Sequence, residues 1–262
     1  MNSRIKLIST DFDGTLFAEF ESPPIPRELQ ALIAELQGSG AKWAINTGRD
    51  MSSLMEALGR TGIGIQPDYL VLVDREIHLH QNSQYLSLEQ WNDACHRDHA
   101  ALFEQVRPEL KKLIDWINSR YKALIYEDPF SPLCIIANDN GDMDVIHAYL
   151  EAFCRTFPGL SVVRNDVYAR FCHVRYNKGT ALAELTQRLG LSPREVFAAG
   201  DHLNDLPMLC KTYAHMIAAP ANAVPAVKAA VLAQGGFISN RPHGEGVADA
   251  IKYYAAGDPG GG

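Results

Sequence analysis

The sequence predicts an α/β protein in which a parallel β-sheet flanked by helices is split by an inserted α+β domain. Short apolar runs alternate with helix-spaced apolar patterns over about residues 5–75, and the same alternation returns from Lys178 onward. Strand–helix–strand alternation is typical of right-handed crossovers in a parallel sheet. The stretch between them carries consecutive short strands instead. We therefore expect a core formed by residues 1–76 and 176–262, and an inserted domain at residues 77–175.

The first part of the core is expected to contain three strands and two helices. Residues 5–9 form an apolar run that ends in Asp-Phe-Asp-Gly, which is typical of a buried parallel strand. Residues 26–37 carry leucines and isoleucine at helical spacing and are followed by Gly38 and Gly40, which favour a helix end. A strand at 43–46, a helix at 51–58 and a strand at 69–73 complete this part.

The inserted domain is expected to begin with a hairpin over residues 76–85. A long helical region follows at 88–118, with an interruption near Pro108 because proline lacks the amide hydrogen of the helix. We expect strands at 123–127 and 133–137, a helix at 143–157, and two strands on either side of Asn165. No internal repeat is present in this stretch.

The second part of the core repeats the strand and helix alternation. The expected helices are 179–189, 203–209, 224–233 and 247–256, and the expected strands are 196–199, 216–218 and 236–238. The closing Gly-Asp-Pro-Gly-Gly-Gly is expected to fray.

Composition excludes several classes of protein. The chain has 262 residues and a net charge of −7, which disfavours a broad nucleic-acid-binding face. Its five cysteines include no Cys-x-x-Cys pair, so a disulfide framework or zinc ribbon is not expected and a reducing compartment is. No run approaches the roughly 18 apolar residues of a membrane helix. We expect a cytoplasmic monomer or homodimer with no nucleic-acid or membrane partner.

Two carboxylates mark the end of the first expected strand. Asp11 and Asp13 are separated by one residue, so in extended backbone both side chains face the same way. Open parallel sheets bind ligands at the carboxyl ends of their strands. Two facing carboxylates repel each other, so a cation or shared proton is expected between them. Taken alone, Asp-x-Asp-Gly is also common in turns and calcium loops, which leaves a structural role open.

Other polar groups follow later strands of the same sheet. Thr47 follows the second strand, Lys178 opens the helix after the insertion, and an acidic cluster at 200–205 follows a later strand. A parallel sheet would gather these positions at one edge. Lys178 alone could be an ordinary solvated lysine. Together the groups supply a hydroxyl donor, an ammonium and a second set of carboxylates facing Asp11 and Asp13.

These residues resemble the haloacid dehalogenase superfamily of phosphohydrolases. Its four motifs are present in order: Asp11-Phe-Asp-Gly-Thr-Leu, Thr47-Gly-Arg, Lys178-Gly, and Gly-Asp201-x-x-Asn-Asp205. The resemblance covers roughly residues 4–75 and 176–256. It implies a Rossmann-like core with an inserted C2 cap of the IIB type. Sugar phosphatases, sucrose-phosphate phosphatase and phosphomannomutase belong to that subgroup.

The resemblance also implies catalytic roles for four residues. Asp11 would attack phosphorus and form an acyl phosphate, and Asp13 would protonate the leaving alkoxide and then act as base for water. Thr47 would donate a hydrogen bond to a phosphoryl oxygen. Lys178 would offset the charge of that group in the transition state.

Metal and substrate ligands are implied in the same way. A Mg²⁺ site would draw on Asp11, Asp13 through its backbone carbonyl, Asp201 and Asp205, because hard oxygen ligands suit this ion. The residues that we expect to bind substrate are Gly48, Arg49, Asn204, Asp74 and Glu76.

The expected function is a Mg²⁺-dependent phosphatase acting on a small phosphate ester through an aspartyl phosphate. The segment Val73-Asp-Arg-Glu-Ile77 is nearer the Gly-Thr-Glu-Ile type of the sucrose-phosphatase-like branch, which favours a sugar phosphate. Two alternatives remain open: a phosphotransferase of the phosphomannomutase kind, which would protect the acyl phosphate from water, and a catalytically inactive metabolite-binding protein. The inserted domain is expected to cover the site and select the substrate.

Overall fold

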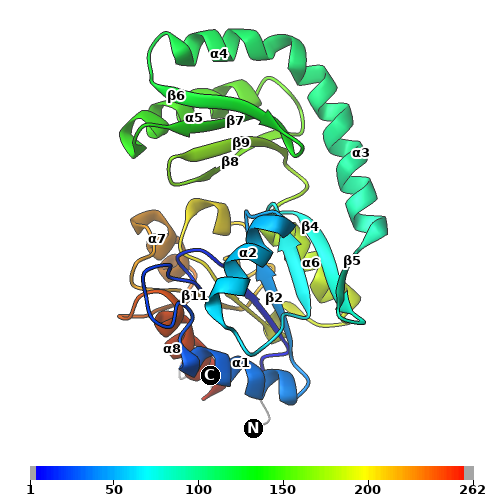
Figure 1. The fold of residues 1–262 in the computed structure, drawn as a ribbon, viewed down its shortest axis with the longest axis vertical. Helices are drawn as coiled ribbons and strands as arrows, with labels where there is room; N and C mark the ends of the chain where they lie inside the picture. Colours follow the sequence, from blue (N-terminus) through cyan, green and yellow to red (C-terminus); the bar gives the residue numbers. More distant parts are fainter. Residues whose placement is uncertain (1–3, 257–262) are drawn as a thin grey trace. The chain divides into compact units, whose positions relative to one another are not determined.

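The computed structural model describes residues 4–256, which form two compact units (Figure 1). The core unit contains the chain up to Leu88 and again from Lys178, and the inserted unit is Glu89–Asn177. The Gly-rich tail expected to fray lies outside the described residues. Within residues 4–256, no helix is long and apolar enough to cross a membrane. The same part of the chain holds all five cysteines, and none of them forms a disulfide.

The core unit is built on an eight-stranded sheet whose strands lie in the order β12-β11-β10-β1-β2-β3-β4-β5. All neighbours from β12 to β3 are parallel, as the alternating pattern predicts. The strands are β1 (Leu7–Thr10), β2 (Lys42–Asn46), β3 (Tyr69–Leu72), β4 (Glu76–Gln81), β5 (Gln84–Ser87), β10 (Val196–Ala199), β11 (Met216–Ala219) and β12 (Phe237–Ile238).

The register of the central strands brings the polar motifs to one edge of the sheet. Thr10 at the end of β1 lies opposite Ala199 of β10 on one side and Ile45 of β2 on the other. The residues that follow these strands therefore leave the sheet at the same level. The edge made by the carboxyl ends of β1, β2 and β10 is the position expected for a ligand site in an open parallel sheet.

The hairpin β4–β5 belongs to the core sheet and not to the inserted unit, where the sequence placed it. β4 pairs antiparallel with β3, with Leu72 opposite Glu76. The chain reverses immediately after β3 because Val73 and Asp74 both adopt positive φ, at 47° and 66°. The boundary of the inserted unit therefore lies after Leu88, about twelve residues later than expected.

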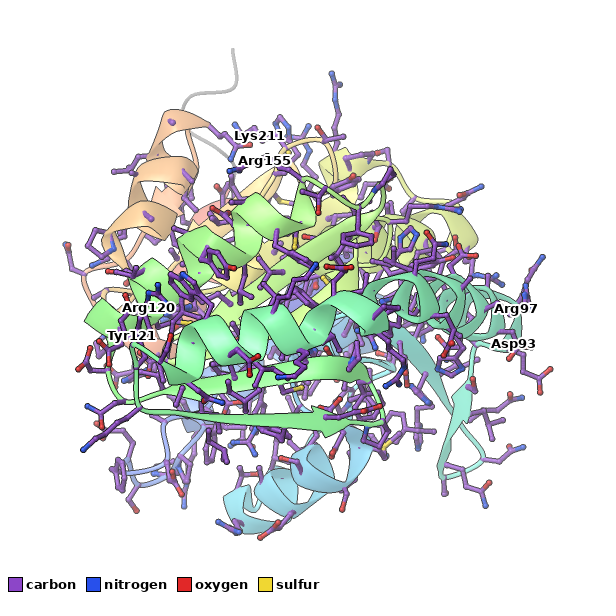
Figure 2. The ribbon with its side chains drawn as sticks, turned by 90° about the horizontal axis from the view of Figure 1, so that it is seen from above. Asp93, Arg97, Arg120, Tyr121, Arg155 and Lys211 are labelled. Atoms are coloured by element: carbon purple, nitrogen blue, oxygen red, sulfur yellow. The ribbon has the colours of Figure 1, made fainter. Side chains whose placement is uncertain are left out.

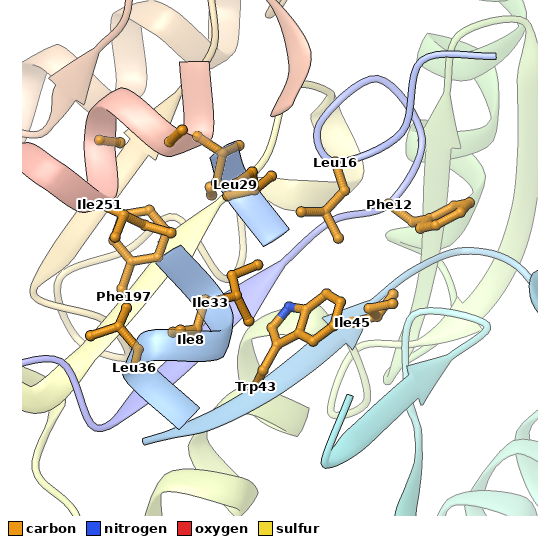
Figure 3. Packing of buried hydrophobic residues seen from close by; sticks show 14 of the residues in the cluster. Ile8, Phe12, Leu16, Leu29, Ile33, Leu36, Trp43, Ile45, Phe197 and Ile251 are labelled. Atoms are coloured by element: carbon orange, nitrogen blue, oxygen red, sulfur yellow. The ribbon is translucent and has the colours of Figure 1, made fainter. Parts of the chain in front are cut away.

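Helices α1 (Arg27–Gly38), α2 (Met51–Thr61) and α8 (His243–Ala255) contribute to one continuous hydrophobic core with the sheet. Figure 3 shows Leu29 and Ile33 of α1 near Ile251 of α8, with Trp43 of β2 in the same layer. Trp43 is fully buried, and its indole N–H donates to Thr10 Oγ1 over 3.1 Å. That bond satisfies the one polar atom of the indole and ties β2 to β1 beside the site. The core unit also contains α6 (Lys178–Arg188) and α7 (Pro225–Ala233).

The inserted unit contains a four-stranded antiparallel sheet in the order β6-β7-β9-β8. Alternate residues of its strands, such as Leu133 and Ile135 of β7, pack with the helices in a separate hydrophobic core. The side chains of Asp93 and Arg97 lie on the outer side of α3, as Figure 2 shows, and both are exposed. The elements are α3 (Glu89–Val106), α4 (Leu110–Asn118), β6 (Ala123–Asp128), β7 (Ser131–Ala137), α5 (Asn140–Cys154), β8 (Leu160–Asn165) and β9 (Tyr168–His173).

Two helix boundaries in the inserted unit are set by residues at or next to the boundary. A 3-10 turn at Arg107–Glu109 separates α3 from α4, where Pro108 predicted an interruption. Helix α5 begins three residues before the predicted position. The Asp139 carboxylate caps it by accepting a hydrogen bond from the Asp142 amide over 2.9 Å.

We predict that Gly179→Ala destabilises the protein and lowers its activity together. A Cβ at this position would lie 2.3 Å from the carbonyl oxygen of Pro207, a backbone atom that cannot rotate away. Relief requires the start of α6, and with it Lys178, to move. We expect a loss of about 1–3 kcal/mol in the free energy of unfolding, measured by urea titration.

The matched control is Gly59→Ala on α2, where nothing lies within 4 Å of an added Cβ. That variant is expected to be neutral or up to about 1 kcal/mol more stable. Equal stabilities for the two variants would contradict the packing explanation.

Candidate active site

The ammonium group of Lys178 lies between two carboxylates at the carboxyl edge of the core sheet. Its Nζ donates to Asp11 Oδ1 and to Asp205 Oδ1, each over 2.6 Å. A third carboxylate, that of Asp74, lies 3.9 Å from the same nitrogen. Lys178 and Asp205 are fully buried, and Asp11 is 6% exposed. Lysine is almost never fully buried unless it is paired, so Lys178 is a component of the site and not a solvated surface residue.

Three separate segments deliver these groups. Asp11 follows β1, and its backbone N–H donates to Ala199 at the end of β10 over 2.9 Å. Lys178 is the first residue of α6. The side chain of Asn46, the last residue of β2, donates to the carbonyl oxygen of Lys178 over 3.0 Å. The ends of the parallel strands thus fix the backbone on both sides of the ion pair.

Asp205 also closes the loop that carries Asp201. Its Oδ2 accepts hydrogen bonds from the backbone N–H groups of Asp201 and His202, over 2.8 and 2.9 Å. Thr15 Oγ1 donates to Asp201 Oδ1 over 2.6 Å. Gly14 makes that approach possible: its φ is 73°, and a Cβ there would lie 2.5 Å from Asp201 Oδ2.

Burial and mutual repulsion dominate the ionisation of these acids. Burial raises the pKa of Asp11 well above its ordinary value, and Asp205 adds to the shift while Lys178 opposes it. Burial likewise raises the pKa of Asp201 to about 7, with Asp205 again adding to it. Burial by itself would lower the pKa of Lys178, but the carboxylates around it, Asp11 first, raise it on balance. The lysine therefore stays charged among more carboxylates than it can neutralise.

A divalent cation fits this excess of negative charge. Asp11, Asp201 and Asp205 each offer an oxygen within 4.8 Å of the others. Both oxygens of Asp205 already accept hydrogen bonds, which favours Asp11 and Asp201 as the direct side-chain ligands. The side chain of Asp13 is paired elsewhere, so only its backbone carbonyl remains for such a role. An all-oxygen donor set suits Mg²⁺.

The Thr47-Gly-Arg turn is tied to the strained turn after β3. The backbone N–H of Asp74 donates to the carbonyl oxygen of Thr47 over 2.9 Å, and Arg49 N–H donates to Thr47 Oγ1 over 3.1 Å. The Asp74 carboxylate accepts from Asn204 Nδ2 over 3.1 Å and lies against Gly48, 3.5 Å from a Cβ there. The structure thus brings Thr47, Gly48, Asp74 and Asn204 beside Lys178, and their roles toward a substrate remain predictions.

Asp13 and Arg49 form a pair of their own at the rim of the site. The guanidinium donates from Nε to Asp13 Oδ2 and from Nη2 to Asp13 Oδ1, both over 2.7 Å. The side chain of Arg49 is 31% exposed and that of Asp13 is 39% exposed, whereas Asp11 is buried. Of the other expected substrate ligands, Glu76 begins β4 opposite Leu72 and is half-buried.

Three supporting residues were not among the predicted site residues. Asn46 holds the backbone of Lys178, Thr15 holds Asp201, and Ser53 accepts from Arg49 Nη1 over 2.9 Å. Asn46 carries a usable signal, because a polar residue at the end of an apolar parallel strand points to the ligand edge. Ser53 lies one helical turn after Arg49, a spacing that allows contact but does not specify it.

Comparisons with known proteins find a matching family model and related phosphatases. A family model described as haloacid dehalogenase-like hydrolase matches residues 8–251. Over 78 residues the chain is 37% identical to a phosphoglycolate phosphatase of Methanoculleus marisnigri, a match that covers 30% of this chain and 31% of that protein. Over 261 residues it is 26% identical to a 5-amino-6-(5-phospho-D-ribitylamino)uracil phosphatase of Bacillus subtilis, covering 95% of this chain and 96% of that protein.

The fold is also similar to a solved structure. The crystal structure of sucrose-phosphatase from Synechocystis, in complex with sucrose and phosphate, superposes with a TM-score of 0.71. The identity is 18%, and the match covers 96% of this chain and 98% of that one. At this identity the likeness establishes the fold.

We predict that Asp201→Asn stabilises the metal-free protein at high pH. The folded-state pKa of Asp201, about 7, lies above its ordinary value of 3.8. The folded state therefore binds a proton that the unfolded state lacks between about pH 4 and 7, and stability falls as the pH rises through that window. In EDTA at pH 8, the variant should unfold with a free energy about 1–3 kcal/mol higher than the wild type.

The difference should shrink toward pH 4, and added Mg²⁺ should stabilise the wild type more than the variant. Asp115→Asn, at an exposed position on α4, serves as the control. A variant that is no more stable than the wild type at pH 8 would show that the ionised Asp201 carboxylate does not destabilise the folded state.

Proposed function

The chain belongs to the haloacid dehalogenase-like hydrolase family and is a phosphatase, and we propose that it hydrolyses a sugar or polyol phosphate through an aspartyl phosphate on Asp11. The observation that carries the proposal is the buried contact of Lys178 with both Asp11 and Asp205, each at 2.6 Å. This contact holds the Asp11 carboxylate in one orientation at the carboxyl edge of the sheet. A nucleophile held in place before substrate arrives needs little reorganisation in the reaction.

In the first half-reaction, Asp11 attacks phosphorus and the bond from phosphorus to the leaving oxygen breaks. The Asp13 carboxylic acid gives its proton to that oxygen, so an alcohol departs. Thr47 supports this step because its hydroxyl already accepts from Arg49 N–H and can direct its own hydrogen to a phosphoryl oxygen. Lys178 offsets the negative charge of the transferred group.

In the second half-reaction, water attacks phosphorus and gives a proton to the Asp13 carboxylate. The bond between Asp11 and phosphorus breaks, which releases inorganic phosphate and restores both aspartates. Mg²⁺, held by Asp11, Asp201 and the backbone carbonyl of Asp13, would supply Lewis-acid stabilisation of the phosphoryl oxygens when bound. Asp205 keeps Lys178 and the Asp201 loop in position throughout.

The polar groups near the site support a polyhydroxylated substrate. Asp74 and Glu76 are carboxylates and Asn204 is an amide, and its Oδ1 is a buried acceptor with no hydrogen-bond partner. Such groups accept hydrogen bonds from hydroxyls and repel a second carboxylate or phosphate. The names of the Bacillus ribitylaminouracil phosphatase and the Synechocystis sucrose-phosphatase support a polyhydroxylated leaving group. We propose that the inserted unit, which interrupts the chain between Leu88 and Lys178, contributes to this selection.

The first test is phosphate release from p-nitrophenyl phosphate with Mg²⁺, with EDTA, and with Asp11→Asn. We expect release that depends on Mg²⁺ and falls by about 10³-fold or more in the variant, because the amide cannot form the acyl phosphate. Asp115→Asn is the control for removal of a carboxylate. Full activity of Asp11→Asn would exclude the aspartyl-phosphate route, and transfer of phosphate to a second sugar without free phosphate would indicate a mutase.

The second test compares leaving groups. Ribitol 5-phosphate should be hydrolysed with a kcat/KM at least about tenfold above that for 2-phosphoglycolate, because the excess carboxylates repel the second anion. Glu76→Gln should lower the ratio of kcat/KM for ribitol 5-phosphate to kcat/KM for 2-phosphoglycolate, because the variant lacks one of the repelling carboxylates. A preference of the wild type for 2-phosphoglycolate would contradict a polyol substrate while leaving the phosphatase mechanism intact.

A further inference from the structure

The side chain of Arg49 is committed to groups of the protein and not to an open anion site. Two of its N–H groups donate to the two oxygens of Asp13, both over 2.7 Å. Its Nη1 donates to Ser53 Oγ over 2.9 Å and to Ser53 O over 3.4 Å. An arginine has five N–H donors, so four are engaged and no pair is left to hold a phosphate in the fork geometry.

The environment of the guanidinium strengthens this pairing. The guanidinium carbon, Cζ, lies 5.6 Å from the centre of the ring of Phe12, which is the residue between Asp11 and Asp13. The hydrogen bond to Asp13 raises the pKa of Arg49, so the guanidinium stays charged. Its backbone is fixed as well, because Arg49 N–H donates to Thr47 Oγ1 and Arg49 O accepts from the Val73 N–H over 2.9 Å.

A two-pronged arginine contact fixes the orientation of its partner carboxylate. A carboxylate accepts two hydrogen bonds from a guanidinium, whereas a protonated carboxyl group must give up one of them. Asp13 acts as an acid in the first half-reaction and as a base in the second. The Arg49 contact, with both bonds at 2.7 Å, fixes the direction in which the Asp13 carboxylate points.

We propose that Arg49 is a positioning residue that holds Asp13 as an oriented carboxylate for the attack of water on the aspartyl phosphate. The inference rests on the proposed function. In this step the water oxygen bonds to phosphorus, its proton passes to Asp13, and the bond from Asp11 to phosphorus breaks. Without Arg49 the nucleophile and Lys178 remain in place, so the enzyme should still form the acyl phosphate but lose it slowly.

Arg49→Met separates the two half-reactions when p-nitrophenyl phosphate is the substrate. Its leaving group departs without a proton, so formation of the acyl phosphate should proceed within about threefold of the wild-type rate. Hydrolysis should slow by roughly 10–100-fold, a part of the 10²–10⁴-fold that a positioned general base supplies. Stopped-flow measurement should then show a burst of about one p-nitrophenolate per active site. Acid-quenched protein should carry covalent phosphate.

Two further variants distinguish orientation from charge. Arg49→Lys keeps the charge but loses the fork, and should recover only part of the hydrolysis rate. Arg60→Met removes an arginine from helix α2, which follows Arg49 in the sequence; Arg60 is exposed and paired with Glu56, and the variant should behave as the wild type.

Other outcomes would overturn the inference. A higher KM and weaker inhibition by inorganic phosphate, with kcat unchanged, would make Arg49 a phosphate ligand. An equal decrease in the rates of both half-reactions would indicate that Arg49 only stabilises the folded structure. If the wild type forms no acyl phosphate at all, the proposed function itself fails, and this inference fails with it.

Discussion

The buried contact of Lys178 with Asp11 and Asp205 is the interaction on which the rest of the site depends. A lone ammonium or carboxylate could not remain charged at this depth, because desolvation would favour its neutral form. Each partner thus requires the others. The parallel register of β1 and β10 sets the spacing of the two carboxylates, and the start of α6 places the lysine between them. The sheet topology therefore also determines which charged groups meet in the site.

The two aspartates after β1 show how neighbouring carboxylates acquire different chemistry. Asp11 is buried and meets an ammonium, while Asp13 is at the rim and meets a guanidinium. The buried group is held in one direction by the Lys178 ammonium. The rim group is 39% exposed, and the proposed mechanism gives it the acid and base roles. In the proposed mechanism these two aspartates divide the roles of nucleophile and acid–base catalyst, and they differ in depth and in partner cation.

Much of this could be predicted from the sequence, because the relevant patterns are local. Apolar spacing predicted the parallel strands and their helices, and strand ends predicted which polar residues would meet. The sequence pattern could not predict which sheet the β4–β5 hairpin joins, since the pairing of a strand depends on tertiary structure. The Arg49–Asp13 contact was missed for a related reason: a motif names a residue but not the side-chain direction. Asn46 was missed because its function is to hold another residue's backbone.

The insertion between β5 and α6 has a consequence for biosynthesis. Asp11 and Lys178 are 167 residues apart in the sequence, and the entire inserted unit is made between them. A growing chain that ends before Lys178 already contains Asp11 and Asp74, but it lacks the lysine whose ammonium lies near both carboxylates and the central strand β10. The emerging amino-terminal part therefore cannot complete its sheet, and its acidic cluster disfavours early compaction. The contact between Lys178 and Asp11 can form only when the last third of the polypeptide has left the ribosome.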